Sequence, residues 1–169
     1  MKVLPVVQMC DAFQPSLNPI KLDSGLPERI PDADSVVKYL SFKQSPTDPE
    51  TGIRMAIPQA FRRREGEEFL SCAWLEFYVP AGADLMKNCA DGFKNALTVR
   101  KSGAFAVGNV LAVRDAGNQF GPRPRIVHEP EDDHQAHAAV RQMNDQNDDL
   151  LLLLAMEAWG KLIPAEDLI

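Results

Sequence analysis

The sequence contains none of the strong motifs that identify a reaction by themselves. It has no glycine-rich phosphate-binding loop and no nucleophile elbow, so the P-loop, dinucleotide-binding and α/β-hydrolase classes have no support. It also has no paired CxxC motif, and three cysteines at wide spacings (Cys10, Cys72 and Cys89) fit neither a disulfide framework nor a zinc knuckle. We therefore expect a reducing environment, with Cys72 and Cys89 as small core residues.

Long apolar segments are also missing. The strongest run, Leu150 to Met156, is far shorter than the roughly 20 residues that a membrane helix needs. The N-terminal segment MKVLPVVQM is interrupted by Pro5 and has neither the length of a signal-peptide core nor a clear cleavage site. These absences predict a cytoplasmic protein with no membrane partner.

The length and composition predict one globular domain. A chain of 169 residues with 45% hydrophobic content can bury roughly two-thirds of its unfolded surface without disulfides or metals. Eight prolines up to Pro58 divide the first third into short pieces, and no internal repeat is present. We interpret residues 1–28 as a proline-rich N-terminal arm and residues 29–169 as a single α+β domain.

Hydrophobic periodicity predicts a small mixed or antiparallel sheet with two main helices. The segment 67–78 is ambiguous, and its spacing favours a helix slightly over a buried strand. In chain order we expect a strand at 35–42, the start of another at 60–64, the ambiguous segment at 67–78, an amphipathic helix at 84–97, strands at 104–113 and 125–128 joined by a loop, and a final helix from Asn147 or Asp148 to about Trp159.

Charge is distributed unevenly along the chain. The net charge is −6, yet from Ile126 onward ten acidic residues face only Arg141 and Lys161, so residues 1–125 carry +2. The basic residues of the middle could form one face that attracts phosphate, or they could be solvated separately. Nucleic-acid binding through Arg62–Arg64 is therefore open but not favoured. The residues in question are Arg54, Arg62, Arg63, Arg64, Arg100, Lys101, Arg114, Arg123 and Arg125.

The segment from Pro58 to Tyr78, PQAFRRREGEEFLSCAWLEFY, gathers cationic, acidic, hydroxyl, thiol and aromatic groups. In a functional interpretation Ser71 or Cys72 is a nucleophile, Glu76 is a base or hydrogen-bond acceptor, and Arg62 to Arg64 bind an anion. In a structural interpretation the apolar residues form the core, Trp74 donates its indole N–H to a buried acceptor, and Glu76 pairs with an arginine. The spacing does not decide between them.

The segment from Ile126 to His137, IVHEPEDDHQAH, holds all three histidines among four acids. Three interpretations stay open. The histidines could bind a metal with Asp132 or Asp133, they could act as general acid and base, or they could lie in a polar surface loop. The spacing matches no zinc motif, so no residue is assigned to a metal and the cofactor is unknown.

Several segments together resemble a group of short bacterial proteins of uncharacterised activity. They are RIPDADSVVKYL, AFRRREGEEFLSCAWLEFY, with its Leu-Ser-x-x-Trp-Leu-Glu pattern, and the His-x-Pro and His-Ala pairs at residues 128–130 and 137–138. The resemblance covers about residues 29 to 165, and Lys38 stands where the group has arginine. It implies that Ser71, Trp74, Glu76, His128 and His137 belong to one site, and it implies no activity.

Two functions follow as hypotheses, and we favour the first because small acidic chains without a recognisable catalytic motif are more often binding proteins than enzymes. The first is an accessory protein that docks on a larger partner, or associates with itself, through the apolar final helix and the N-terminal arm. The second is a small hydrolase or transferase that acts on a phosphorylated or nucleotide-containing substrate. Its expected catalytic residues are His128, His137, Glu76 and Ser71, and its expected substrate-binding residues are Arg62, Arg64 and Trp74.

Overall fold

One antiparallel sheet of seven strands organises the computed structural model, which describes residues 28–169. The strands are β1 (Glu28–Arg29), β2 (Ser35–Leu40), β3 (Phe69–Trp74), β4 (Ala104–Asn109), β5 (Arg125–His128), β6 (His137–Arg141) and β7 (Lys161–Pro164). They lie in the order β1-β5-β6-β3-β2-β4-β7, so β1 and β7 are the two edges. The predicted α+β class is confirmed. The predicted arm at residues 1–28 lies outside the described residues except for Glu28.

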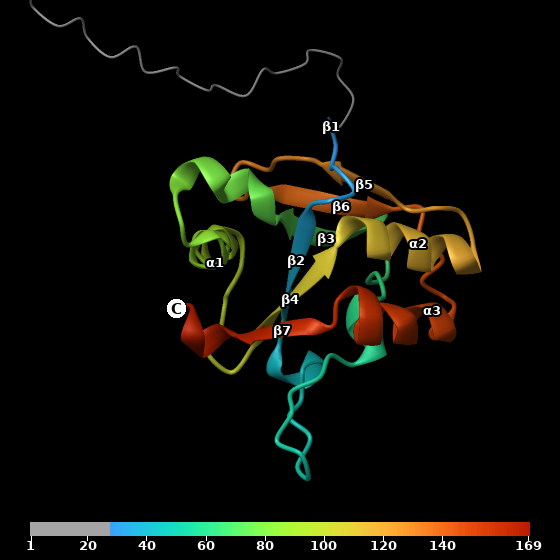
Figure 1. Ribbon diagram of the computed structural model, residues 1–169, viewed down its shortest axis with the longest axis horizontal. Helices are drawn as coiled ribbons and strands as arrows, with labels where there is room; N and C mark the ends of the chain where they lie inside the picture. Colours follow the sequence, from blue (N-terminus) through green and yellow to red (C-terminus); the bar gives the residue numbers. More distant parts are fainter. Residues whose placement is uncertain (1–27) are drawn as a thin grey trace, which may run out of the picture.

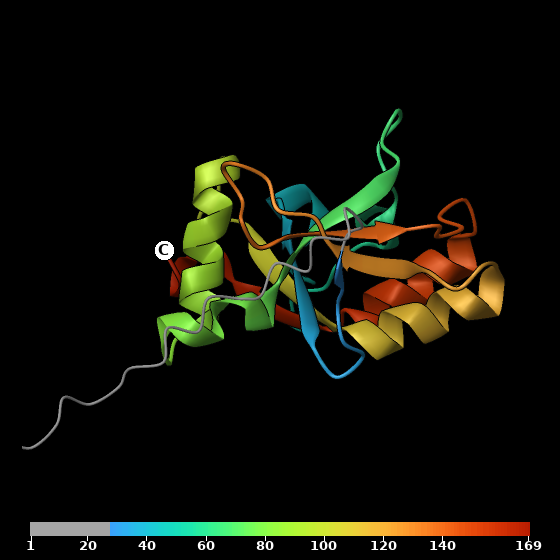
Figure 2. The same cartoon turned by 90° about the horizontal axis from the view of Figure 1, so that it is seen from above.

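Helices cover both faces of the sheet. Helix α1 (Leu85–Ala96) lies on one side, and α2 (Val110–Phe120) and α3 (Asp148–Leu153) lie on the other, as Figures 1 and 2 show from two directions. A π-helical turn, Leu154–Ala158, continues α3. Among the described residues, no helix has the length and apolar character that crossing a membrane requires.

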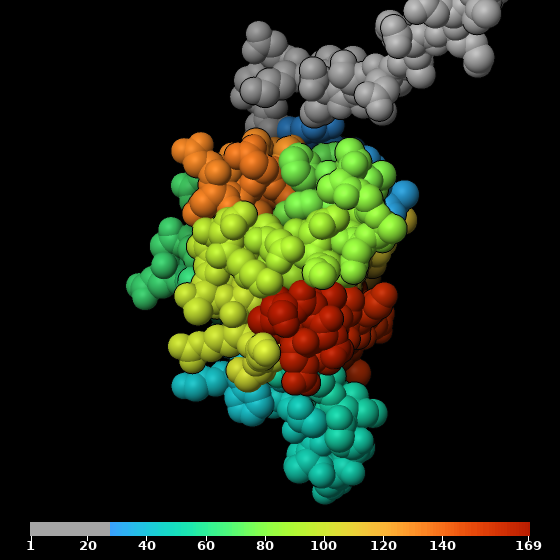
Figure 3. Space-filling model, turned by 90° about the vertical axis from the view of Figure 1, so that its left-hand side faces the viewer, coloured from blue at the N-terminus to red at the C-terminus, as the bar shows by residue number. Residues whose placement is uncertain are grey.

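Two hydrophobic cores result, one on each face. Side chains of successive strand residues point to opposite faces, so Val36 and Cys72 pack with α2 and α3, whereas Val37 and Ala73 pack with α1. Figure 3 shows α1 above the red C-terminal segment that completes the second core, and the loop after β2 projects below them. Both faces of the central strands are therefore buried.

This two-sided burial explains why the segment 67–78 differs from its predicted structure. The segment 67–78, for which helix was favoured, forms strand β3 followed by a 3-10 helix, Leu75–Ala81. A strand covered on both faces loses the alternation of apolar and polar residues that identifies a half-buried strand. The aromatic and apolar content of Phe69–Trp74 indicated the strand correctly, whereas the spacing of its apolar residues did not.

Two further segments differ from expectation. The strand expected at 60–64 is absent, because Pro58 begins a 3-10 helix, Pro58–Phe61, and the ring of Phe61 packs 5.5 Å from that of Trp159. The strand expected at 104–113 ends at Asn109, whose side chain accepts a hydrogen bond from the Ala112 N–H at 3.1 Å and caps α2. Helix α2 thus replaces much of the predicted loop, and strands β1, β6 and β7 were not predicted.

The remaining elements are confirmed. Strands β2 and β5 lie where expected, and α1 begins after Asp84, which accepts a hydrogen bond from the Lys87 N–H. Asn147 caps α3 through the Leu150 N–H at 3.0 Å, and the final helical segment reaches Trp159. At β4, Gly108 gives Trp159 room, since a Cβ there would lie 2.7 Å from a ring carbon.

A buried ion pair ties the segment before β3 to the segment before α3. Asp145, only 1% exposed, accepts hydrogen bonds from the Arg63 side chain at 2.7 and 2.9 Å and from the Arg63 backbone N–H at 2.7 Å. Burial alone would raise the pKa of Asp145, but these bonds outweigh it and hold the pKa below its usual range.

The Asp145→Asn variant is expected to lose roughly 2–3 kcal/mol of unfolding free energy near neutral pH, because it weakens a buried charged pair. Since the folded-state pKa lies below the unfolded value of about 3.9, the wild-type advantage is complete above that value and disappears as pH falls through the folded-state pKa. Urea unfolding over this pH range measures both effects. The control Asp91→Asn, which removes an exposed pair with Lys94 on α1, should cost about 0.5 kcal/mol or less. A deficit that stays constant down to acidic pH would contradict the assignment.

Candidate functional site

The divergence of two central strands opens a groove beside Ser71. Strand β2 pairs with β4 over all six of its residues but with β3 only at Val36–Trp74 and Val37–Ala73. Beyond those pairs β2 and β3 separate, and a groove of about 750 Å³ lies there. One acidic residue, Glu67, lines it, but most of its polar side chains are cationic or carry a hydroxyl group: Lys38, Tyr39, Ser41, Arg62, Arg63, Arg64, Ser71 and Thr98.

Within this region Ser71 forms a hydrogen bond with His137. The distance from Ser71 Oγ to His137 Nε2 is 3.0 Å. Strand β3 pairs with β6 so that Ala73 is opposite His137 and Ser71 is opposite Ala139, which makes Ser71 and His137 diagonal neighbours on one face. Ser71 is exposed at the groove, whereas His137 is only 2% exposed.

The other ring nitrogen fixes the orientation and tautomer of His137. Its Nδ1 lies 2.8 Å from the carbonyl oxygen of Glu129, and a carbonyl can only accept, so Nδ1 carries the proton. In the neutral ring Nε2 is then the acceptor, and Ser71 donates its hydroxyl proton to it. The Glu131 carboxylate, 3.6 Å from Nδ1, can stabilise a positive charge on the ring. This is the arrangement of a nucleophile, a general base and an orienting group.

Cationic groups line the groove near the Ser71 backbone. Lys38 Nζ donates to the Ser71 carbonyl oxygen at 3.3 Å, and burial, with a contribution from the Arg64 charge, lowers the pKa of Lys38. Arg64 is 86% exposed, and its ion pair with Glu67 is long, at 3.9 Å. Arg62 is bound to Asp148 at 2.7 Å. Lys38 and Arg64 are therefore the groove cations that no short ion pair with a described residue holds, and sequence reasoning did not name Lys38 as a site residue.

His128 does not join this arrangement. It is opposite Ala138, the neighbour of His137 in β6, so the register places the two histidines on opposite faces of the sheet. His128 Nε2 donates to the Gln135 carbonyl at 2.8 Å, and its ring packs 5.4 Å from that of Trp74. The predicted acid and base pair is not brought together.

Trp74 and Glu76 connect the end of β3 to the start of β2. Trp74 Nε1 donates to the Asp34 carboxylate at 2.8 Å, and the Glu76 carboxylate accepts from the Ser35 N–H at 2.8 Å. Neither side chain lines the groove. Their contacts fit positions that hold the two strands together where they still pair.

The third histidine, His134, lies beneath the site. It is 3% exposed, its ring packs 4.8 Å from that of Phe93, and burial together with the nearby His137 lowers its pKa to about 4. It is therefore neutral at physiological pH. The described residues contain no cluster of three or more His, Cys, Asp or Glu side chains suited to a metal ion.

No protein-family model, curated protein sequence or solved structure shows significant similarity to this chain. Membership of the group of short bacterial proteins therefore stays a prediction. The candidate site rests on geometry alone.

Cys72 is separated from Ser71 by the strand alternation and is expected to be unreactive. It is fully buried, and burial raises the pKa of its thiol to about 12 and raises that of Cys89 as well. In a Cys10→Ala variant, an aqueous thiol reagent at mildly alkaline pH should modify both cysteines at least about a thousandfold more slowly than a free cysteine. Denaturant should restore normal rates. Rapid labelling of Cys72 in the native protein would contradict this prediction and make its thiol a candidate nucleophile.

Proposed function

We propose that this protein is a small cytoplasmic hydrolase or transferase that acts on a phosphorylated or nucleotide-containing substrate. Ser71 is the nucleophile and His137 is its general base. The observation that carries the proposal is the 3.0 Å hydrogen bond from Ser71 to a histidine whose tautomer is fixed by the Glu129 carbonyl.

The reaction proceeds through a covalent intermediate on Ser71. As Oγ forms a bond to the electrophilic phosphorus or carbonyl carbon, its proton moves to His137 Nε2, and the departing group takes that proton as its own bond breaks. Water, or an acceptor hydroxyl in a transferase, then gives a proton to His137 while its oxygen displaces Oγ. Ser71 recovers the proton, so the pair returns to its starting state.

The cations of the groove support an anionic substrate. Arg64 offers a planar fork that matches phosphate oxygens, and Lys38 places a compact charge beside the Ser71 backbone. The groove volume of about 750 Å³ is within the range for a nucleotide-sized ligand. Trp74 does not line the groove, so the substrate-binding role predicted for it is not part of this proposal.

A fluorophosphonate probe, which reacts with base-activated serines, tests this proposal. Wild-type protein should become labelled at Ser71, and the Ser71→Ala variant should not. The His137→Gln variant should react at least about a hundredfold more slowly because the general base is gone. The matched control is Ser102→Ala, which removes an exposed serine outside the groove and should label normally. Unlabelled Ser71 in the wild type would contradict the enzyme proposal, provided that circular dichroism shows folded variants.

A different observation favours the other hypothesis, docking of a protein partner. An apolar groove of about 640 Å³ lies between the loop after β2 and the segment from α3 to β7. Four large hydrophobic side chains at this groove are 47–70% exposed: Ile53, Met55, Leu152 and Met156. The groove runs beside β7, an open sheet edge, so an extended segment could pair with β7 and place apolar side chains in the groove.

An uncovered apolar groove predicts self-association of the isolated chain. Sedimentation velocity should show a sedimentation coefficient that rises with wild-type concentration, and Met156→Glu should abolish that rise by placing a charge in the groove. The control Val79→Glu changes a residue of similar exposure, 57%, outside the groove, and should behave as the wild type does. A wild-type monomer at every soluble concentration would count against this function.

A further inference from the structure

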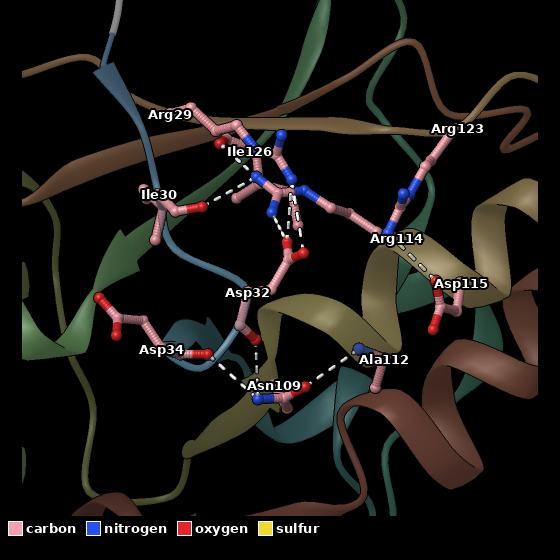
Figure 4. Close-up of polar contacts among 10 residues, drawn as sticks. All are labelled: Arg29, Ile30, Asp32, Asp34, Asn109, Ala112, Arg114, Asp115, Arg123 and Ile126. Carbon is pink, nitrogen blue, oxygen red and sulfur yellow. Dashed lines mark hydrogen bonds and ion pairs between the residues drawn. The ribbon is translucent and has the colours of Figure 1, made fainter.

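Four arginines converge on a second cavity, away from Ser71. Arg29 comes from β1, Arg114 from α2, Arg123 from the turn after α2, and Arg125 from β5. The cavity measures about 260 Å³, and Pro124, Ile126 and Val127 complete its lining. Figure 4 shows three of these arginines, Arg29, Arg114 and Arg123, with the Asp32 carboxylate that Arg29 and Arg114 contact. None of the four arginines lines the groove beside Ser71.

Arg114 is the fixed centre of this cavity. It is only 2% exposed, and its Nη2 donates to the carbonyl oxygens of Ile30 at 2.9 Å and Ile126 at 3.1 Å. Its Nη1 contacts the Asp32 carboxylate. A buried guanidinium held by two backbone carbonyls and a carboxylate is preorganised, so a ligand need not order it on binding.

Positive charge exceeds negative charge around the cavity. Asp32 serves both Arg114 and Arg29, the latter at 3.2 Å, and Asp115 pairs with Arg123 at 3.3 Å. Arg125 makes no side-chain ion pair with the described residues. Two carboxylates therefore face four guanidinium groups. Burial, followed by the charges of Arg29 and Arg123, lowers the pKa of Arg114 to about 10.

We infer that this four-arginine cavity is a phosphate site, with Arg114 as the fixed contact and Arg29, Arg123 and Arg125 as the groups that close on the anion. Arginine forks match the oxygens of a phosphate in pairs, and a dianion would neutralise the excess of two charges. The cavity is smaller than the range for drug-sized ligands. It therefore suits inorganic phosphate, or the phosphate end of a phosphomonoester whose remainder stays outside.

Titration calorimetry of the full chain with inorganic phosphate, at constant ionic strength adjusted with chloride, tests the site. Wild-type protein should show a saturable phosphate site, and Arg125→Gln should weaken binding at that site by about tenfold or more because it removes a charge-assisted contact. Arg125 is exposed and holds no ion pair with the described residues, so this variant should fold normally. The control Arg100→Gln removes an exposed arginine outside the cavity and should change affinity less than about twofold.

A third variant separates this site from the groove beside Ser71. Arg64→Gln should leave phosphate affinity unchanged if the four-arginine cavity is occupied. Loss of binding in Arg64→Gln with normal binding in Arg125→Gln would place the phosphate in the groove and overturn the inference. Absence of saturable binding by the wild type, or equal weakening by Arg125→Gln and Arg100→Gln, would overturn it as well.

Glycerol 3-phosphate in the same titration identifies the source of the phosphate group. Tighter binding than inorganic phosphate would assign a phosphomonoester, and weaker binding would assign the free ion. Either result supports the site, provided that Arg125→Gln weakens it.

Discussion

The pairing of β3 with β6 is the constraint on which the candidate site depends. Because Ala73 is opposite His137, the side chains of Ser71 and His137 share the face covered by α1, and their polar atoms meet at 3.0 Å. A shift of the register by one residue would turn one of the two side chains to the other face. The same register sends Cys72 and Ala138 to the opposite core, which removes the thiol from the site.

The second constraint is the short contact between β2 and β3. Two residue pairs hold these strands together, and Trp74 and Glu76 add hydrogen bonds to Asp34 and Ser35 just beyond that contact. Past the pairs, the freed edge of β3 leaves the Ser71 carbonyl to accept from Lys38. The groove is thus a consequence of sheet geometry, and the loop with Arg62 to Arg64 adds positive charge to it. The hydrogen bonds of Trp74 and Glu76 hold the two strands together, and neither side chain lines the groove.

The sequence could predict those parts of the fold that local signals determine. Helix α1 has a capping aspartate and an apolar stripe, and β2 and β5 are β-branched runs between turns, so these elements were predictable. Strand β3 was not, since burial on both faces removes its alternation, and Asn109 ends β4 by a cap within a continuous apolar stretch. For the site, residue type singled out Ser71 and His137, but only the strand register could show that His128 lies on the other face. The Glu129 carbonyl that orients His137 has no sequence signal, because every residue has a carbonyl.

The distribution of arginines bears on which ligands fit the protein. The basic residues that could have formed one continuous face are divided by the fold. Arg54 donates to the carbonyls of Ser45 and Gly103, Arg64 stands at the groove beside Ser71, and Arg114 lies in the four-arginine cavity. Nucleic-acid binding gains its strength from many phosphate contacts along a continuous surface, whereas the four-arginine cavity and the groove beside Ser71 share no lining residue. In a chain with a net charge of −6, local clusters of this kind favour small phosphorylated ligands over a polyanion, and this supports both the substrate class of the proposed enzyme and the separate phosphate site.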